Sequence, residues 1–592
     1  MRHEIGPSGI SRSSRPLLLV LLLAAGCSVV GQGPPVELEL AVFSDARFSV
    51  GDNRLGVQVG ERPDAAFRPL LAYLEVEDPS GRRRRTEARW RLAGDAANRL
   101  SIEFTALEPG VHRGRLRIYD EDRAELAFVD NELRLRVWPR YQLVADRSYY
   151  TGEGTLHFRL RDLQGAANEV KIIRVELRGD SLAHGQRQLS QRGAEVIGEL
   201  PIAALAPGNY RLDARVYGHD GLEDSASVPV RKLVPAPTET KIDQFTGTLL
   251  RNGEPFFPVG LYWLRSEMLA DARRLRFNSG DYYYRYEPSE IAALMEGAAD
   301  EGLGILLELS DYIRRRDEPD LAGIDSVVAQ YRAHPALLAW YLIDEPGETG
   351  VAPEVTTALY RRVAEMDPYH PVYLVNNRPH LYAAHIGAAD ILAIDPYPIP
   401  KYPITRVREY VQEAVWSSRG EKPVWLVAQA FGGVEHWPRA PTPVELRNMV
   451  YQGLVQGAKG VLFYRFCQEQ ERHIQPEELW REVCRLSAEL RELTAALISP
   501  DWQFPIRGDG GELSRVAGVD VMLKQMAEGY YLFMVNVTDR RRTVPLSEMA
   551  LPPFDEAVPL HGAPEPGWVD GRLHLSLAPL QAAVYRLKRS PI

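Results

Sequence analysis

The segment Leu338-Ala-Trp-Tyr-Leu-Ile-Asp-Glu-Pro346 is a short apolar run that ends in two acids and a proline. A run of this length, apolar throughout and closed by a turn residue, is typical of a strand buried on both faces of a parallel sheet. Seven more such runs, separated by helical stretches, lie between the Pro-rich linker Val234-Pro-Ala-Pro-Thr-Glu-Thr240 and Ser499. Eight βα units in residues 241–499 predict a closed (β/α)8 barrel, whose usual size is about 250 residues.

The bounds of these units follow from where each apolar run begins and ends. The predicted strands are Phe256–Tyr262, Arg276–Gly280, Gly304–Leu309, Leu338–Ile343, Val372–Val375, Ile391–Ile394, Val424–Ala428 and Gly460–Tyr464. The predicted helices include Pro288–Glu301, Ile324–His334, Pro353–Met366, Ile404–Arg419, Pro443–Gln456 and Pro476–Leu497. Thr442 is the expected N-cap of one helix, because Pro443 then takes the first helical position, which suits proline.

On both sides of the barrel, apolar residues alternate with polar ones, the period of a half-buried strand. The segment Ala106-Leu-Glu-Pro-Gly-Val-His-Arg113 recurs, with changes, as Ala204-Leu-Ala-Pro-Gly-Asn-Tyr-Arg211, one Ig-sized domain of about 100 residues further on. We therefore expect Ig-like β-sandwiches at 35–139 and 140–233, and a small C-terminal β-domain at 500–592.

The N-terminus is typical of an export signal. A basic leader precedes the apolar run Pro16–Gly26, which is shorter than the about 20 residues needed to span a bilayer. We expect a signal peptide at 1–26. Small residues directly before Cys27 resemble the bacterial lipobox, so Cys27 is the expected lipidation site of a periplasmic or cell-surface lipoprotein, with plain secretion as the alternative.

Composition narrows the range of partners. The 592 residues, 45% hydrophobic and 25% charged, have the balance of a folded protein. A net charge of -10 repels phosphate backbones and disfavours nucleic acid. Three Cys are too few for a disulfide scaffold or a Cys-ligated zinc site. Neutral or cationic partners therefore fit better than nucleic acid. We expect no cofactor, and membrane contact only through the lipid anchor; the oligomeric state stays open.

In a (β/α)8 barrel, reactive side chains lie at the carboxyl ends of the strands. Those positions hold Tyr262, Trp263, Asn278, Asp281, Glu308, Asp311, Asp344, Glu345, Asn376, Asn377, Asp395, Tyr397, Gln429, Tyr464 and Arg465. The set contains no His pair for a metal, no Gly-rich phosphate loop and no GxSxG elbow. Its carboxylates and aromatic rings suit cleavage of a glycosidic bond, which requires an acid and a base or nucleophile.

The motif Trp340-Tyr-Leu-Ile-Asp-Glu-Pro346 resembles the Asn-Glu-Pro-like motif that ends strand four in clan A of the glycoside hydrolases, a large group of retaining (β/α)8 glycosidases. The segment Gly247–Trp263 also resembles the start of the barrel in β-galactosidase-like members, and the resemblance extends from Thr246 to Ser499. It implies that Glu345 is the general acid/base, that a nucleophilic Glu ends strand seven, and that β-sandwiches flank the barrel.

The sequence departs from that pattern at two positions. Asp344 stands where the group has Asn. Gln429 stands where the nucleophilic Glu would be, and an amide cannot form the glycosyl ester. Another carboxylate is then required. Asp395 is the first candidate, and Glu435 and Glu308 are alternatives.

The separation of the two catalytic carboxylates bears on the mechanism. Strands four and six are two apart, which is roughly 10 Å at about 4.8 Å per strand before the side chains lean inward. That distance is closer to the roughly 6.5 to 9.5 Å of inverting enzymes than to the roughly 5 to 5.5 Å of retaining ones, so an inverting pair of Glu345 and Asp395 is a hypothesis beside the retaining mechanism. Because successive side chains on a strand point to opposite sides, Asp344 and Glu345 are not expected to face the substrate equally.

The remaining candidates are substrate-binding residues. They are Tyr262, Trp263, Asn278, Tyr282, Asp344, Asn376, Tyr397, Gln429 and Tyr464. Aromatic faces stack on sugar rings, although the same rings also fill cores. The predicted function is hydrolysis of O-glycosidic bonds in an extracytoplasmic oligo- or polysaccharide. The alternative is a catalytically inactive surface lipoprotein that binds glycan.

Overall fold

A computed structural model describes most of the chain between Leu40 and Lys588. The described ranges are 40–43, 48–49, 51–59, 69–91, 99–120, 125–162, 171–179, 183–191, 195–218, 221–282, 287–314, 318–418, 420–434, 436–465, 473–500, 515–516, 518–549, 551–569 and 572–588. The predicted leader, Cys27 and Glu435 lie outside these ranges. No helix within them is long and apolar enough to cross a membrane.

The chain divides into two compact units that meet in sequence between Val137 and Trp138, with the short strand β2 (Phe48–Ser49) grouped with the second unit. The first unit contains antiparallel sheets with the strand orders β1-β3-β6 and β8-β7-β4-β5. These strands are β1 (Leu40–Phe43), β3 (Gly51–Val59), β4 (Pro69–Glu77), β5 (Arg83–Arg91), β6 (Arg99–Ala106), β7 (Gly110–Asp120) and β8 (Glu125–Trp138). On β4, Leu70, Ala72 and Leu74 are buried, as the alternating pattern predicts.

The second unit begins with two more antiparallel sheets, ordered β13-β10-β9 and β12-β11-β14-β15. Their strands are β9 (Tyr141–Ala145), β10 (Thr155–Asp162), β11 (Lys171–Arg178), β12 (Ala183–Gln191), β13 (Glu195–Pro201), β14 (Gly208–Gly218) and β15 (Gly221–Lys232). Leu156 and Phe158 from one sheet and Val175 and Leu212 from the other belong to one hydrophobic core. The two sheets therefore pack face to face.

A closed barrel of eight parallel strands follows, in the order β19-β20-β21-β22-β23-β24-β25-β26. The strands are β19 (Val259–Leu261), β20 (Ser279–Asp281), β21 (Gly304–Glu308), β22 (Leu337–Asp344), β23 (Val372–Val375), β24 (Ile391–Ile394), β25 (Val424–Gln429) and β26 (Val461–Tyr464). The predicted eight-stranded barrel is confirmed. The first strand is shorter than predicted, because β18 (Glu254–Phe256) instead pairs with β17 (Thr248–Arg251).

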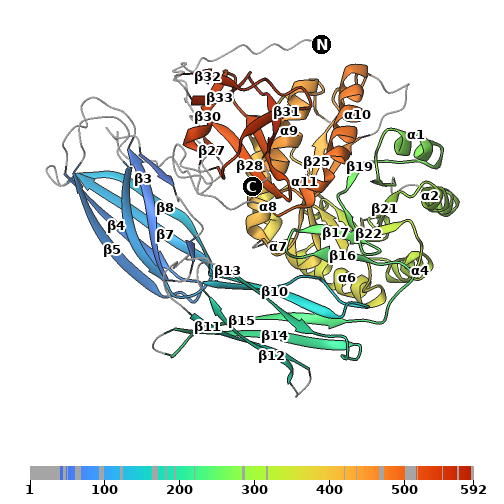
Figure 1. Cartoon of the computed structure of the whole chain (residues 1–592), viewed down its shortest axis with the longest axis horizontal. Coiled ribbons are helices and arrows are strands. Elements are labelled where there is room, and N and C mark those ends of the chain that lie inside the picture. Colours follow the sequence, from blue (N-terminus) through green and yellow to red (C-terminus); the bar gives the residue numbers. More distant parts are fainter. Residues whose placement is uncertain are drawn as a thin grey trace, which may run out of the picture. The chain divides into compact units, whose positions relative to one another are not determined.

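Helices cover the outside of the barrel (Figure 1). The helices of this part of the chain are α1 (Leu269–Arg274), α2 (Pro288–Asp300), α3 (Asp311–Arg314), α4 (Leu321–Tyr331), α5 (Pro346–Thr349), α6 (Pro353–Met366), α7 (Tyr382–His385), α8 (Arg406–Ser417), α9 (Pro443–Val455), α10 (Glu477–Glu492) and α11 (Thr494–Ile498). The short helices α3 and α5 directly follow the carboxyl ends of β21 and β22. The predicted cap of α9 is confirmed. The Thr442 hydroxyl accepts from the Glu445 N–H at 3.3 Å, and the Glu445 carboxylate accepts from the Thr442 N–H at 2.8 Å.

The interior of the barrel is filled by alternate residues of its strands, such as Trp425 and Val427 on β25. Ile242 on β16 (Thr240–Asp243) and Leu249 on β17 join the same interior cluster. The hairpin of β16 and β17 therefore closes one end of the barrel.

Arg251, at the end of β17, identifies which end is closed. Its Nη2 donates to the carbonyls of Leu303 at 3.1 Å and Pro335 at 2.8 Å, which precede β21 and β22. The hairpin thus covers the amino ends of the strands, and the carboxyl ends remain as the mouth.

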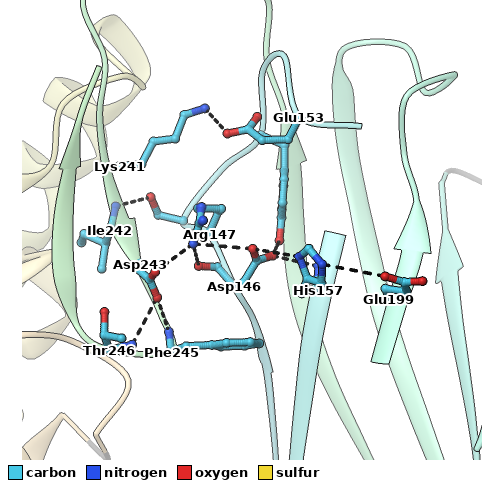
Figure 2. Close-up of polar contacts among 12 residues, drawn as sticks. Asp146, Arg147, Glu153, His157, Glu199, Lys241, Ile242, Asp243, Phe245 and Thr246 are labelled. Atoms are coloured by element: carbon cyan, nitrogen blue, oxygen red, sulfur yellow. Dashed lines mark hydrogen bonds and ion pairs between the residues drawn. The ribbon is translucent and has the colours of Figure 1, made fainter. Parts of the chain in front are cut away.

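Ion pairs and hydrogen bonds join this hairpin to the sheets before it (Figure 2). Nη1 of Arg147 lies 3.0 Å from Oδ2 of Asp243 and 3.5 Å from Oδ2 of Asp146. Nζ of Lys241 lies 2.6 Å from Oε1 of Glu153. The attraction within these pairs offsets the cost of removing buried or half-buried charges from water.

The C-terminal region forms two further antiparallel sheets, ordered β27-β28-β29-β34-β31 and β30-β33-β32. Their strands are β27 (Arg515–Val516), β28 (Val519–Met526), β29 (Gly529–Asn536), β30 (Arg542–Pro545), β31 (Glu556–Leu560), β32 (Gly567–Val569), β33 (Arg572–Leu577) and β34 (Ala582–Lys588). Phe533 and Val535 share a hydrophobic core with α9. Asn448 on α9 donates to the carbonyls of Asn536 at 3.0 Å and Leu580 at 2.8 Å, which ties this region to the barrel.

Candidate active site at the barrel mouth

Acidic side chains stand at the carboxyl ends of four barrel strands. Asp281 is the last residue of β20, Glu308 of β21 and Asp344 of β22. Glu345 follows Asp344, and Asp395 follows β24. Burial, and after it the charge of Glu308 and then that of Asp344, raises the pKa of Asp281 well above its usual value. The acids of neighbouring strands therefore lie close enough to interact at the rim.

Glu345 and Asp395 form a pair within this group, because their carboxyl groups are hydrogen bonded to each other. Asp395 is 5% exposed, whereas Glu345 is half-buried. Burial, the charge of Glu345, the shared hydrogen bond and then the charge of Asp344 raise the pKa of Asp395 well above its usual value. The pair therefore keeps a proton at a pH at which an ordinary Asp has lost its own.

The contact between Glu345 and Asp395 is much closer than strand counting predicts. The oxygens of a hydrogen bond lie about 2.5 to 3.0 Å apart, whereas the roughly 10 Å between strands two apart is a backbone spacing before the side chains lean inward. Strand counting measures the spacing of backbones, whereas these two side chains lean toward each other across the mouth. Ile391 and Ala393 point into the barrel. Because every second residue of a strand points to the same side, Asp395 also points inward.

The backbone of Glu345 contributes to this contact. Glu345 has φ 44° and ψ 61°, a left-handed conformation, although the residue before a proline usually adopts an extended one. Such conformations cost about 1 to 3 kcal/mol and cluster at functional sites. The register of β22 also shifts between Tyr341 and Asp344. The charges of both Asp344 and Glu345 raise the pKa of Asp395, so both carboxyl groups lie near it. That the two acids face a substrate unequally stays a prediction.

Hydrogen bonds from the protein orient two further acids. Oδ1 of Asp344 accepts from the Tyr341 hydroxyl at 2.7 Å, and Oδ1 of Asp281 accepts from the Trp263 N–H at 2.8 Å. Trp263 has φ 66°, a second left-handed residue at the mouth. Each of these acids is thereby held at the end of its own strand.

Three buried tyrosines form a layer inside the barrel. The hydroxyl oxygens of Tyr262 and Tyr373 are 2.9 Å apart. The Tyr341 ring lies edge-on to both, with centroids 6.3 Å from Tyr262 and 4.9 Å from Tyr373. Through Tyr341, this layer also reaches Asp344. The layer therefore forms a polar floor beneath the acidic group.

Aromatic rings gather at the ends of β19, β24 and β26. Tyr397 and Tyr464 are stacked, with centroids 5.7 Å apart and an interplanar angle of 21°. Trp263 lies edge-on to Tyr464 at 5.2 Å, and Trp437 lies edge-on to Tyr397 at 5.8 Å. The Arg465 guanidinium lies 4.4 Å from the centre of the Trp263 ring. All four rings are half-buried and keep exposed surface that a sugar face can cover.

Gln429 turns its amide toward the segment after β24. The residue is fully buried; its Oε1 accepts from the Ile399 N–H at 2.9 Å. Its Nε2 donates to the carbonyls of Ile399 at 2.8 Å and Phe431 at 3.4 Å. Because these bonds use both sides of the amide, we do not include Gln429 among the proposed sugar-binding residues.

Asn278 and Tyr282 are also engaged by backbone groups. Oδ1 of Asn278 accepts from the Val259 N–H at 2.8 Å, and its Nδ2 donates to the Phe257 carbonyl at 2.9 Å. Asn278 precedes β20 and so lies at the amino end of the strand, away from the mouth. The buried Tyr282 hydroxyl donates to the Glu308 carbonyl at 2.5 Å. These bonds give both residues a structural role, and we leave them out of the proposed site.

Two buried polar atoms on neighbouring strands are unsatisfied. Within the described part of the chain, neither Nδ2 of Asn376 nor Oδ1 of Asp395 has a hydrogen-bond partner. The N–H of Asn376 donates to the Ala393 carbonyl at 3.0 Å, so Asn376 and Asp395 follow paired strands. Buried polar atoms normally bind a partner, which makes these two atoms positions for a substrate hydroxyl or a water molecule.

Sequence reasoning missed some residues of this site. Asp281 is visible as a strand-end acid, but it was not expected to act with the others. Tyr341 and Tyr373 lie inside their strands, where an apolar run hides them. Among the described residues, no three His, Cys, Asp or Glu side chains are grouped to hold a metal ion.

The likeness of this chain to known proteins is distant. No protein-family model and no curated protein matches the sequence. Similar solved structures include a family 39 glycoside hydrolase from Bacteroides cellulosilyticus, at 12% identity and a TM-score of 0.39 over 75% of this chain and 98% of that one. A β-glucuronidase from Ruminococcus gnavus has 12% identity and a TM-score of 0.32 over 74% of this chain and 89% of that one. The β-D-glucuronidase of Dictyoglomus thermophilum has 12% identity and a TM-score of 0.33 over 74% and 90%.

Proposed function

We propose that the barrel mouth hydrolyses O-glycosidic bonds, with Glu345 as the proton donor and Asp395 as the second carboxylate. The observation that carries this proposal is the hydrogen-bonded pair of these carboxyl groups at the ends of β22 and β24. Cleavage of a glycosidic bond requires one carboxylic acid and one carboxylate. A pair that shares one proton supplies both.

The exposure of the two side chains supports the division of roles. A general acid works best when its pKa lies near the working pH, and burial beside a second acid moves a carboxyl pKa in that direction. Glu345 is half-buried and can reach a leaving-group oxygen, whereas Asp395 is enclosed. The raised pKa of Asp395 belongs to the pair without a sugar. Once a sugar separates the two groups, Glu345 gives the proton of the pair to the leaving-group oxygen, which it can reach, and Asp395 acts as the carboxylate.

The mechanism also requires space between the two groups. Inverting pairs are roughly 6.5 to 9.5 Å apart and retaining pairs roughly 5 to 5.5 Å, so the hydrogen-bonded pair is closer than either. We infer that a sugar bound between Glu345 and Asp395 breaks their hydrogen bond. Glu308 is the alternative second carboxylate, because it is buried and its charge acts on Asp281 in the same acidic group.

The substrate of this proposal is an oligo- or polysaccharide. Trp263, Tyr397 and Tyr464 supply apolar faces for sugar rings. Asn376 has an amide donor ready for a hydroxyl, and Asp344 places a further carboxyl group beside the pair.

The location of the proposed activity follows from the leader. The basic residues and apolar run at 1–26 support export, and the small residues before Cys27 support a lipid anchor at that Cys. We propose a periplasmic or cell-surface lipoprotein in which Ig-like sandwiches precede the barrel and a β-domain follows it.

A screen of the purified protein on aryl glycosides and polysaccharides tests the function. We expect release of product by the wild type, its loss in Glu345→Gln, and its retention in Glu348→Gln. Glu348 is a matched control, because it is exposed, three residues away, and paired with Arg378 at 2.8 Å.

The same screen tests the alternative function, which is glycan binding without catalysis. Binding of a polysaccharide without turnover, unchanged by Glu345→Gln, would establish that alternative and overturn the proposed hydrolase.

A further inference from the structure

We propose that Gln429 is a positioning residue, which sets the place of Asp395 and Tyr397 by holding the proline-rich segment after β24. This inference rests on the proposed function, because Asp395 is the second carboxylate there. It explains why an amide occupies the position at which related enzymes would have a nucleophilic Glu.

The segment Asp395-Pro-Tyr-Pro-Ile-Pro400 has few ways to be held in place. Its three prolines have no N–H, so between 396 and 400 only Tyr397 and Ile399 can donate from the backbone. Ile399 uses both its N–H and its carbonyl on Gln429. Tyr397 is held separately, since its carbonyl accepts from Nε1 of Trp437 at 3.0 Å.

The amide of Gln429 acts on Ile399 as a neighbouring strand would. One peptide-like group donates to the carbonyl and accepts from the N–H of the same residue, which fixes both the position and the orientation of that residue. Proline restricts the backbone between Asp395 and Ile399. A displacement at Ile399 is therefore passed along a stiff segment to Asp395 and Tyr397.

A carboxylate at position 429 cannot make the same contacts. When ionised it has no hydrogen to donate, and it would face the carbonyl oxygens of Ile399 and Phe431 in a fully buried site. When protonated it can accept from the Ile399 N–H and donate to the Ile399 carbonyl, as Gln429 does. The structure thus assigns opposite consequences to the two protonation states of a Gln429→Glu variant.

The first experiment measures kcat and KM against pH for Gln429→Glu and Gln429→Met. We expect Gln429→Met to lower kcat about 100-fold at every pH, as a displacement of about 1 Å near the chemistry does. Gln429→Glu should approach the wild type in acid and fall increasingly below it as the pH rises. A rise of kcat in Gln429→Glu, with a sugar ester formed at position 429, would overturn the proposal.

Gln452→Glu is the matched control. Gln452 is equally buried, and its Nε2 donates to the Ile404 carbonyl at 3.2 Å and to Oδ1 of Asn448 at 2.6 Å, away from the mouth. We expect this variant to lower the melting temperature but to leave the shape of the pH profile unchanged. If the pH profile of kcat changes in the same way in Gln452→Glu, the effect at Gln429 is general destabilisation. That result would contradict a positioning role for Gln429.

The second experiment does not depend on activity. Hydrogen exchange of the peptide that covers 395–400 reports the amides of Tyr397 and Ile399, and we expect faster exchange in Gln429→Met than in the wild type. Unchanged exchange would show that Gln429 does not hold Ile399, even if the protein is a glycosidase. Faster exchange with unchanged kcat would overturn the positioning role. Faster exchange in a protein without any glycosidase activity would refute the proposed function, but it would confirm that Gln429 holds Ile399.

Discussion

The carboxyl groups of Glu345 and Asp395 are hydrogen bonded to each other at the mouth of the barrel. They come from strands two apart in the barrel, and the contact depends on the left-handed backbone of Glu345 and the inward direction of Asp395. A strained residue that brings two acids together is expected to persist where the pair has a task.

Asp395→Asn tests the second half of this pair. The amide can still hydrogen bond to Glu345, so the local structure should remain, but it cannot carry a negative charge. We expect kcat to fall by about 10² to 10⁴ with KM changed only a few-fold, in steady-state kinetics on the best substrate of the screen. Full turnover by Asp395→Asn would transfer the role to Glu308, for which Glu308→Gln is the corresponding variant.

The stability of the protein should depend on pH through the buried acids. Burial first, and neighbouring acids second, raise the pKa of both Asp281 and Asp395 above the usual 3.8. A carboxyl whose pKa is raised by folding stabilises the folded state fully below its unfolded pKa, and this stabilisation is lost as the pH rises through the folded value. We therefore expect the melting temperature to fall as the pH rises from about 4 toward neutrality.

Asp281→Asn isolates one contribution to that dependence. The amide oxygen can still accept from the Trp263 N–H, and the buried charge is removed. Calorimetry should show a flatter dependence of the melting temperature on pH and, at about pH 8, a higher value than in the wild type. Parallel profiles for variant and wild type between about pH 5 and 8 would refute this assignment.

The stacked ring of Tyr397 should contribute to substrate binding. Tyr397→Ala removes the stacked partner of Tyr464 and with it a ring face that we propose contacts the sugar. We expect KM to rise about tenfold, equivalent to about 1.4 kcal/mol of lost binding, with a smaller change in kcat. Tyr397→Phe keeps the ring and serves as the control, so equal defects in both variants would point to the hydroxyl rather than to stacking.

Asp367 should matter for stability alone. Its Oδ2 accepts from Nε1 of the buried Trp340 at 2.8 Å and lies 2.8 Å from Nδ1 of His370, while its Oδ1 accepts from the Tyr369 N–H at 3.0 Å. Asp367→Ala leaves the Trp340 donor buried and unsatisfied, at a cost of about 1 to 3 kcal/mol. Chemical denaturation should show this loss, whereas kcat at a permissive temperature should be unchanged. A fall in kcat without a loss of stability would contradict a structural role.

Much of the fold could be predicted because its signals are local. Each barrel strand is an apolar run of a few residues, and the cap of α9 is a contact between residues three apart, so neither needs information from elsewhere in the chain. Glu345 and Asp395 could be chosen as acids for the same reason, since each directly follows or ends such a run. The direction of their side chains could not, because it depends on a shift of register in β22 and on the left-handed backbone of Glu345.

The partners of the polar candidate residues could not be predicted from local sequence signals. Asn278 and Gln429 have amides suited to a sugar hydroxyl, yet both bind backbone groups of other segments. No sequence pattern distinguishes a ligand-binding amide from one that holds a distant loop. Tyr341 and Tyr373, which support the site, are hidden within apolar runs.

The sequence by itself thus determined the order of strands and helices, the closure of eight βα units into a barrel, and the presence of acids and aromatic rings at the strand ends. Those features depend on hydrophobic periodicity, which is a property of residues that are close together in the sequence. The tertiary structure alone decided that Glu345 contacts Asp395, that Gln429 holds Ile399, and that Asn278 faces away from the mouth. Those relationships depend on which atoms meet across strands, and hydrogen bonds act over about 3 Å between residues that the sequence places far apart.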